Sequence, residues 1–509
     1  MNFLVVDCGT SGCRAAVVSS KGRLLSQSKI PITVIRTCRD TAELDLNHLW
    51  AQVRAVIKKE VKKHSPSSFA CLGISAMLGW VFLDDQAKPL MPAITYMDNR
   101  ASGEAKKILE LIPLNEIFAK SGRRPSPFLL APNLLWLAEN VPDTYLRIHK
   151  VIGLKDEMVH RLTGELQTDP SHLNYSMFFN VRESRLDPEI LKFLGVDSYI
   201  FPPCGLPSHI AGHIREGVAK ELDLPKGLPV VTGSSDGTAA MYGGGILQNG
   251  TAVLVSGSTD VLMTRSDTYP DDPEHILTVN TGPSPGTFLI GGPLGFSGAT
   301  LSYLTQLFQQ DAKKLNRAAA SIGPAGPELL FSPGLEGEKA PFWMEHVRGG
   351  IVGLTLHHRP CHIYRAAMEG CAFRLKKLLM VMDQAGLRPR AINIVGGGAT
   401  IEAWNQMRAD ITGIEIRKLN IAEATCMGTA MFCSQALSPQ ASMEELASEW
   451  IRIENRYFPD EAKASYYREA VSLFEEYIRN AGALAEQIER LKTQTAAPLQ
   501  VHTRVNEIK

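Results

Sequence analysis

The cysteines of this sequence form no CxxC pair and no spacing typical of a zinc site. They are odd in number, nine, and dispersed over 509 residues, so we expect reduced thiols instead of a disulfide framework. A run of about 18 uncharged apolar residues is missing, so we expect no membrane-spanning helix. The N-terminus lacks a basic segment and Asp7 interrupts its apolar run, so we expect no signal peptide. These absences predict a cytoplasmic globular protein.

An excess of charge of either sign is also missing. Lys plus Arg and Asp plus Glu number 53 each, so the formal net charge is zero. No strong global field favours nucleic acid or an acidic membrane surface, and we expect neither as a partner. Two common nucleotide-binding loops are absent, because the sequence contains no GxxxxGK[ST] and no GxGxxG that opens a helix. Any nucleotide must therefore be held by other turns.

The length and the patterning indicate an α/β protein with more than one domain. A chain of 509 residues is too long for one hydrophobic core. Strand-like runs, such as residues 70–75, alternate with helical patterns, such as the one that runs from Asp45 to Val61. We expect two or more domains, followed by closing helices (441–491) and a mobile tail (492–509).

The stretch VVDCGTSGCRAAVV near the N-terminus predicts a hairpin whose turn suits an anion. Backbone N–H groups around Gly9 form a concave anion site, and the hydroxyls of Thr10 and Ser11 add donors. Arg14 offers a positive fork for phosphate. Asp7 cannot bind phosphate directly, but it suits a water-mediated contact with Mg²⁺. From these residues alone, a surface hairpin with Asx and Ser/Thr turns is the alternative.

Later segments repeat this order of a strand and a glycine-rich turn. Residues 228–237 predict a strand that enters the turn GSSDG, and residues 251–263 predict two strands around the turn SGST. The repetition indicates an internally duplicated architecture. A third glycine cluster, GGGA at 396–399, follows another strand-like run.

These segments resemble, in order, the landmarks of the FGGY carbohydrate kinases, a family within the actin/hexokinase/Hsp70 superfamily. The motif Asp7-x-Gly9-Thr10-Ser11-x-x-Arg14 is similar to the family's first phosphate motif, GSSDG at 233–237 to its catalytic segment, and SGST at 256–259 to its second phosphate turn. GLEGEKAP at 334–341, RAAMEGCAF at 365–373 and GGGA at 396–399, followed by Trp404, Asn405 and Gln406, continue the agreement. The landmarks cover about residues 3–435.

The resemblance implies two actin-like (ribonuclease H-like) α/β domains, an N-terminal one (1–245) and a C-terminal one (246–440). They flank an interdomain catalytic cleft, where ATP, Mg²⁺ and a sugar meet. It makes Asp236 the general base for the attacking hydroxyl and places Asp7 and Asp236 near the metal. Without the resemblance, Asp236 would be interpreted as an N-cap or turn aspartate. The other residues that it implies are Gly257, Ser258 and Thr259 for phosphate and Gly396, Gly397, Gly398 and Ala399 for adenosine.

The sugar-binding residues are inferred from two segments. Met77, Leu78, Gly79 and Trp80 stand where xylulose kinases show a QMHG loop, whose Gln and His are absent here. Trp80 either stacks on the apolar face of a sugar or belongs to the core. Asp98 and Arg100 lie in a segment similar to the family's WxDxR, with Tyr in place of Trp. They either bind sugar hydroxyls or form a structural ion pair.

Two departures from the family pattern lie on the nucleotide side. Ser256 stands where a glycine commonly begins the second phosphate turn. Thr400 and Ile401 follow GGGA, where many relatives have Lys or Arg and then Ser. The backbone geometry of the turn and the adenosine contacts beyond Ala399 stay open.

The sequence predicts an ATP-dependent kinase that phosphorylates a hydroxyl of a small sugar, with a ketopentose such as xylulose or ribulose favoured. Another ketose, a polyol or a sugar acid is the alternative, although the length and motifs favour a five- or six-carbon ketose over glycerol. An actin/Hsp70-like ATPase and a catalytically silent sugar-binding regulator are the rivals from other classes. A homodimer is left open.

Overall fold

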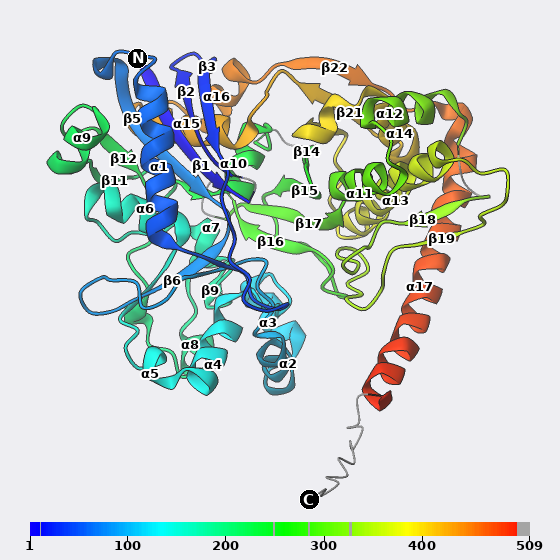
Figure 1. The fold of residues 1–509 in the computed structure, drawn as a ribbon, viewed down its shortest axis with the longest axis horizontal. Helices are drawn as coiled ribbons and strands as arrows, with labels where there is room; N and C mark the ends of the chain where they lie inside the picture. The colour runs from blue at the N-terminus through cyan, green and yellow to red at the C-terminus, as the bar shows by residue number, and fades with distance from the viewer. Residues whose placement is uncertain (11, 248–249, 283–285, 325–327, 496–509) are drawn as a thin grey trace, which may run out of the picture.

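The computed structural model describes residues 1–509 except 11, 248–249, 283–285, 325–327 and 496–509. A seven-stranded sheet forms the core of the N-terminal half (Figure 1). Its strands are β1 (Asn2–Gly9), β2 (Gly12–Ser19), β3 (Leu24–Ile30), β5 (Phe69–Ala76), β11 (Ile210–His213), β12 (Pro229–Val231) and β13 (Ser234–Ser235). They are arranged in the order β11-β12-β5-β1-β2-β3, and β13 pairs with β5.

A second seven-stranded sheet forms the core of the C-terminal half. Its strands are β14 (Thr251–Ser256), β15 (Thr259–Ser266), β16 (Thr278–Thr281), β17 (Phe288–Phe296), β20 (Ala391–Val395), β21 (Glu415–Leu419) and β22 (Ile453–Tyr457), in the order β16-β17-β15-β14-β20-β21-β22. In both sheets the first strand of an antiparallel hairpin, β1 or β14, also pairs in parallel with a later strand, β5 or β20. The two-domain α/β prediction is confirmed, and the shared order agrees with an internal duplication.

Helices cover both faces of the first sheet. They are α1 (Leu46–Val61) and α6 (Leu154–Thr163) on one face, and α10 (Asp236–Gly243) and α15 (Ala424–Leu437) on the other. Successive side chains of β1 alternate between these layers: Leu4 and Val6 pack with α1 and α6, whereas Phe3 and Val5 pack with α10 and α15. Because strands of the second sheet join the same cluster as α10 and α15, these two helices lie between the sheets.

Helix α1 begins as the sequence predicts. The Asp45 side chain accepts hydrogen bonds of 2.8 Å from the backbone N–H groups of Asn47 and His48, which have no partner within the helix. Of the apolar residues that the sequence places on the buried face, Val53, Ile57 and Val61 are buried, whereas Trp50 is half-buried.

Helices α10 and α15 pack unusually closely. A Cβ atom on Gly243 would lie 2.0 Å from the Ala424 carbonyl oxygen, and one on Gly428 would lie 1.9 Å from that of Ala239. The small residues that follow GSSDG in the sequence are therefore required by this contact. Helix α15 also contacts β1 and β5, so a late segment of the chain braces the first sheet.

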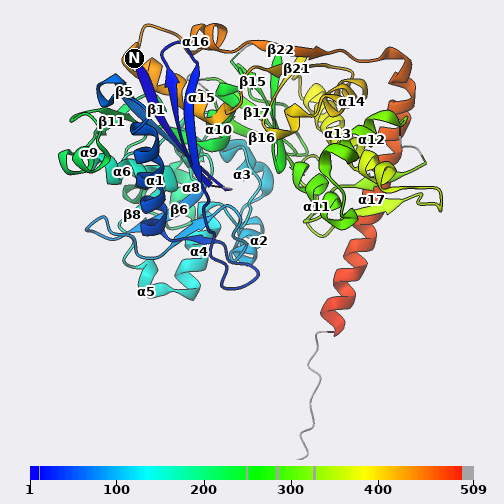
Figure 2. The same cartoon turned by 45° about the horizontal axis from the view of Figure 1, so that its top comes forward.

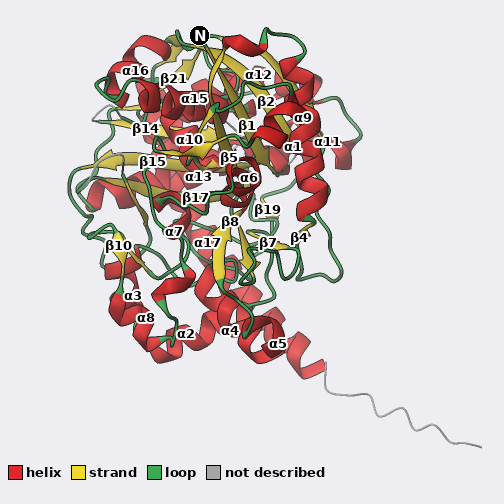
Figure 3. Ribbon diagram, turned by 90° about the vertical axis from the view of Figure 1, so that its left-hand side faces the viewer, coloured by secondary structure: helices red, strands yellow, loops and turns green. Residues whose placement is uncertain are grey.

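The remaining elements surround these layers. In the N-terminal half they are β4 (Glu43–Leu44), β6 (Gly79–Leu83), β7 (Ala93–Thr95), β8 (Lys150–Gly153), β9 (Phe179–Asn180), β10 (Arg185–Leu186), α2 (Ser102–Leu111), α3 (Leu114–Ser121), α4 (Leu130–Asn140), α5 (Pro142–Tyr145), α7 (Pro170–Leu173), α8 (Pro188–Phe193) and α9 (Glu216–Leu222). In the C-terminal half they are α11 (Gly298–Phe308), α12 (Ala312–Ser321), β18 (Leu330–Ser332), β19 (Gly350–Val352), α13 (Pro360–Gln384), α14 (Glu402–Thr412), α16 (Met443–Trp450) and α17 (Ala464–Thr495). Helices α2 to α5 and α8 gather at one end of the molecule (Figure 3).

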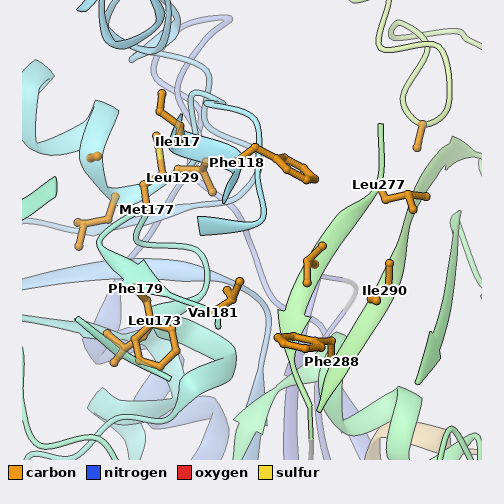
Figure 4. Packing of buried hydrophobic residues seen from close by; sticks show 14 of the residues in the cluster. Ile117, Phe118, Leu129, Leu173, Met177, Phe179, Val181, Leu277, Phe288 and Ile290 are labelled. Atoms are coloured by element: carbon orange, nitrogen blue, oxygen red, sulfur yellow. The ribbon is translucent and has the colours of Figure 1, made fainter. Parts of the chain in front are cut away.

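One hydrophobic cluster joins the two halves. Phe118 of α3 and Phe179 of β9 belong to the same cluster as Leu277 and Ile290, which lie on and beside the second sheet (Figure 4). The Phe118 ring also stacks on His275 with a centroid distance of 4.7 Å. Apolar burial of this kind stabilises the arrangement of the two halves.

The prediction that residues 441–491 form only helices is wrong for β22, which pairs antiparallel with β21 between α16 and α17 (Figure 2). Most of β22 is exposed, so its sequence IENRY has no apolar alternation that would have indicated a strand. Helix α17 continues to Thr495, into the expected tail, and residues 496–509 lie outside the described part. Among the described residues, no helix has the length and apolar character that crossing a membrane requires.

Candidate active site

Asp7 lies near the end of β1, between its partners in two neighbouring strands. Arg14 of β2 is its antiparallel partner and Ser75 of β5 its parallel partner. The Ser75 hydroxyl donates a hydrogen bond of 3.3 Å to Asp7 Oδ1. Burial, and after it the charge of Asp236, raises the pKa of Asp7 to about 7, although Arg14 and Ser75 act in the opposite direction.

Asp236 is the first residue of α10 and follows β13, which pairs with the end of β5. Its Oδ1 accepts a hydrogen bond of 2.7 Å from the N–H of Gly237. Burial raises the pKa of Asp236, while the Gly237 N–H and the His172 side chain act to lower it. Because β1 and β13 both pair with the end of β5, Asp7 and Asp236 come within electrostatic reach of each other.

The carboxylates of Asp7 and Asp236 are suited to bind Mg²⁺. Asp7 and Asp236 offer carboxylate oxygens, the ligands that this hard cation prefers, and their raised pKa values show that a nearby cation would be stabilising. The described residues hold no group of three or more His, Cys, Asp and Glu suited to a metal. Two carboxylates are sufficient for Mg²⁺, because this ion is commonly held by one or two carboxylates together with water and phosphate.

The described residues of the first predicted phosphate turn are accessible to different degrees. Gly9 is half-buried and Thr10 is exposed, with its hydroxyl 3.0 Å from the Tyr96 hydroxyl. Ser11 lies outside the described residues. Arg14 forms an ion pair with Glu423, the residue that precedes α15, 409 positions later in the chain. No sequence pattern had indicated this partner of Arg14.

The other predicted phosphate and nucleotide residues meet at one edge of the second sheet. Strands β14 and β20 are parallel neighbours, so the turn after Ser256 and the loop after Val395 emerge side by side. Ligands of α/β sheets commonly bind at the carboxyl ends of such strands. The residues of the turn are Gly257 (half-buried), Ser258 and Thr259 (both exposed), and those of the loop are Gly396 (half-buried), Gly397 (exposed), Gly398 and Ala399 (both buried).

Close packing between the turn and the loop explains the glycines. Gly396 has φ of 91°, and a Cβ atom on it would lie 2.6 Å from the Ser256 carbonyl oxygen. A Cβ atom on Gly398 would lie 2.1 Å from Ser256 Oγ. No side chain fits at either position without displacing β14.

Ser256, which stands where the family resemblance leads us to expect a glycine, is bonded to a buried arginine. Arg408 Nη2 donates a hydrogen bond of 2.8 Å to Ser256 Oγ and lies 3.3 Å from Asp260 Oδ2. Its guanidinium also stacks on Trp404, 3.7 Å from the ring centroid. Because Ser256 and Asp260 flank the second turn, Arg408 fixes both ends of it. Sequence reasoning missed Arg408 and Asp260, since neither forms part of a recognisable motif.

On the sugar side, the geometry favours the structural interpretation of Trp80 and the Asp98–Arg100 pair. Trp80 is 4% exposed and its indole N–H donates a hydrogen bond of 2.9 Å to the Phe128 carbonyl. Arg100 donates hydrogen bonds of 2.8 Å and 2.7 Å to the two carboxylate oxygens of Asp98, and a third to Glu43. With these donors engaged, the pair holds β4 and the segment after β7 together.

The two residues before Trp80 differ in burial. Gly79 is buried, and a Cβ atom there would lie 2.6 Å from the Leu154 side chain, so packing accounts for this glycine. Leu78 is half-buried, and its carbonyl accepts the Tyr96 N–H at 3.0 Å. This bond places the exposed Tyr96 between Leu78 and Thr10.

Comparison with known proteins identifies the family and the fold of the chain. Residues 2–243 match the N-terminal domain and residues 252–437 the C-terminal domain of the FGGY family of carbohydrate kinases. A probable L-xylulose kinase of Haemophilus influenzae is 29% identical over 92% of this chain and 96% of its own, and a gluconokinase of Bacillus licheniformis is 26% identical over 93% and 94%. The crystal structure of a ligand-bound xylulose kinase from Lactobacillus acidophilus is 24% identical and shares the fold, with a TM-score of 0.89 over 95% of this chain and 98% of that one. The chain belongs to the FGGY family of carbohydrate kinases.

Proposed function

We propose that this kinase transfers the γ-phosphoryl group of ATP to a hydroxyl of a ketopentose such as xylulose or ribulose, with Asp236 as the general base. Membership of the family makes the protein an ATP-dependent phosphotransferase that acts on a carbohydrate. The observation that carries the assignment of the base is the approach of Asp7 and Asp236 at the end of β5, beside the first glycine turn, whereas the ketopentose is supported by the names of relatives. Relatives at similar identity are named xylulose kinase or gluconokinase, so a sugar acid is the second candidate.

The roles of the residues follow from their chemistry. Asp236 accepts the proton of the attacking hydroxyl, and its raised pKa makes it a better base than an ordinary carboxylate. Arg14 and the turn at Gly9 and Thr10 hold phosphate oxygens from one side, and the second turn holds them from the other. Mg²⁺, held by Asp7 and Asp236, would neutralise charge on the phosphates when bound. We propose that the cleft between the two domains brings these groups together and excludes water.

A substrate screen tests the proposal. Purified protein with ATP and Mg²⁺ is offered xylulose, ribulose, hexuloses, polyols and gluconate, and ADP release is measured. We expect a ketopentose to give a kcat/KM at least about 10-fold above gluconate, the scale that one or two lost hydroxyl contacts produce. Mass and NMR of the product identify the hydroxyl that is phosphorylated. A higher kcat/KM for gluconate would contradict the ketopentose and indicate that the substrate is a sugar acid.

The Arg14–Glu423 pair supports a further prediction. Glu423→Gln removes the charge that orients the Arg14 guanidinium, so we expect kcat to fall about 10-fold, on the scale of one charge-assisted contact. Glu139→Gln is the control, because Glu139 pairs with Lys107 on the exposed surface and its loss should leave kcat unchanged. Steady-state kinetics of both variants checks this. Faster turnover of Glu423→Gln would show instead that Glu423 competes with phosphate for Arg14.

A further inference from the structure

A buried group of charges lies behind the segment that carries Asp236. Lys155 of α6 is fully buried and forms ion pairs with Asp156 and with Asp169, whose Oδ1 lies 3.0 Å from Lys155 Nζ. Although burial opposes it, the charge of Lys155 lowers the pKa of Asp169 to about 2, so this carboxylate is ionised. Such a group is fixed in place, because a displacement would leave a buried charge unpaired.

Asp169 connects the buried ion pair to α7. Its Oδ2 accepts a hydrogen bond of 2.8 Å from the N–H of Ser171 in the first turn of α7. The neighbouring His172 is 1% exposed and its ring packs on Gly153, where a Cβ atom would lie 2.2 Å from a ring carbon. The Gly153 N–H in turn donates to Asp156 Oδ2 at 2.8 Å. Helix α7 is therefore held against the start of α6.

Ser171 connects this unit to the segment of the base. Its Oγ accepts a hydrogen bond of 2.8 Å from the N–H of Ser235, the residue before Asp236. Ser235 also caps α10, because its Oγ accepts from the N–H of Thr238 at 3.4 Å. Ser171 is 5% exposed, so water cannot readily replace its hydroxyl.

We propose that Ser171 is a positioning residue for Asp236: its hydroxyl fixes the backbone before Asp236 against the buried Lys155–Asp169 pair. The inference rests on the proposed function, in which Asp236 is the general base. A base displaced by about 1 Å loses rate on the order of 10²-fold, so one backbone hydrogen bond has a measurable effect here. The predicted nucleotide residues lie on the second sheet and do not depend on this bond.

The first test compares two buried serines. Ser171→Ala is expected to lower kcat about 10- to 100-fold while KM for ATP stays within about twofold. Ser176→Ala is the matched control, because Ser176 is buried and its Oγ likewise accepts a backbone N–H, that of Phe178 at 3.0 Å. It should lower Tm by a similar small amount and leave kcat within about twofold. Wild-type kcat in Ser171→Ala would overturn the proposal.

Two further variants separate positioning from a general loss of stability. In an Asp236→Asn background the base is absent, so adding Ser171→Ala should change the residual rate by less than about twofold, as quantified by product mass over long incubations. If Ser171→Ala lowered the residual rate of Asp236→Asn by the same factor as it lowers kcat of the wild type, Ser171 would have a merely structural role. Ser171→Thr keeps an acceptor oxygen and should keep kcat within about fivefold of the wild type. A wild-type protein that phosphorylates none of the sugars would instead contradict the proposed function.

Discussion

Asp236→Asn is expected to lower kcat about 10³-fold, within the range that a general base contributes to catalysis. Asparagine has nearly the same shape but cannot accept the proton of the attacking hydroxyl. ATP binding should persist, because the phosphate turns and the GGGA loop are unchanged by this substitution. Steady-state kinetics with the best sugar measures the loss, and isothermal titration calorimetry measures the affinity for ATP.

Asp84→Asn is the control for the alternative that Asp236 is only a turn aspartate. Asp84 Oδ1 accepts hydrogen bonds from the N–H groups of Gln86 at 2.9 Å and Lys88 at 2.8 Å, much as Asp236 accepts from Gly237. We expect Asp84→Asn to change Tm slightly and kcat not at all. If Asp236→Asn behaved in the same way, Asp236 would be a turn aspartate and the assignment of the base would be wrong.

Asp7→Asn is expected to stabilise the ligand-free protein while it lowers kcat/KM at least about 100-fold. The pKa of Asp7 is raised from 3.8 to about 7 in the folded protein, so its ionisation opposes folding. This cost is absent below about pH 4, grows as pH rises towards 7 and is complete above that. The raised pKa of Asp7 corresponds to a free-energy cost of several kcal/mol, and we expect a gain of about 2 kcal/mol because the asparagine is also buried.

Denaturant unfolding of the wild type and Asp7→Asn without ligands checks this at pH 5 and pH 8. The gain should be larger at pH 8, where Asp7 is ionised in the folded wild type. Ser75→Ala is a useful control, because it removes a hydrogen bond to Asp7 without removing the charge, and it should destabilise the protein. A destabilised Asp7→Asn at pH 8 would show that Asp7 is a structural carboxylate and not one held for a cation.

Local patterns were sufficient to predict much of the fold and some of the site. Helix α1 and its Asp45 cap follow from apolar spacing and one acidic residue, and both hairpins follow from β-branched runs around glycine turns. The proximity of Asp7 and Asp236 was implied by the family resemblance alone, and the structure explains it by the pairing of β1 and β13 with the end of β5.

Residues that act across the fold could not be predicted in this way. Glu423 reaches Arg14 only because α15 packs on β1, a contact that no local pattern encodes. The hydrogen bond between Ser171 and Ser235 could not be predicted, because it forms only where the fold places α7 beside β13. Trp80 was left open between sugar and core, since an aromatic residue has the same sequence pattern in both settings.

The most direct test of the central claim is product analysis of a single reaction with ATP, Mg²⁺ and the best sugar of the screen. Phosphorus NMR and mass spectrometry quantify ADP, inorganic phosphate and sugar phosphate together. The account predicts one sugar phosphate for each ADP, with little inorganic phosphate and little ADP when sugar is omitted. ADP and inorganic phosphate released without sugar phosphate would contradict it and would indicate an actin/Hsp70-like ATPase.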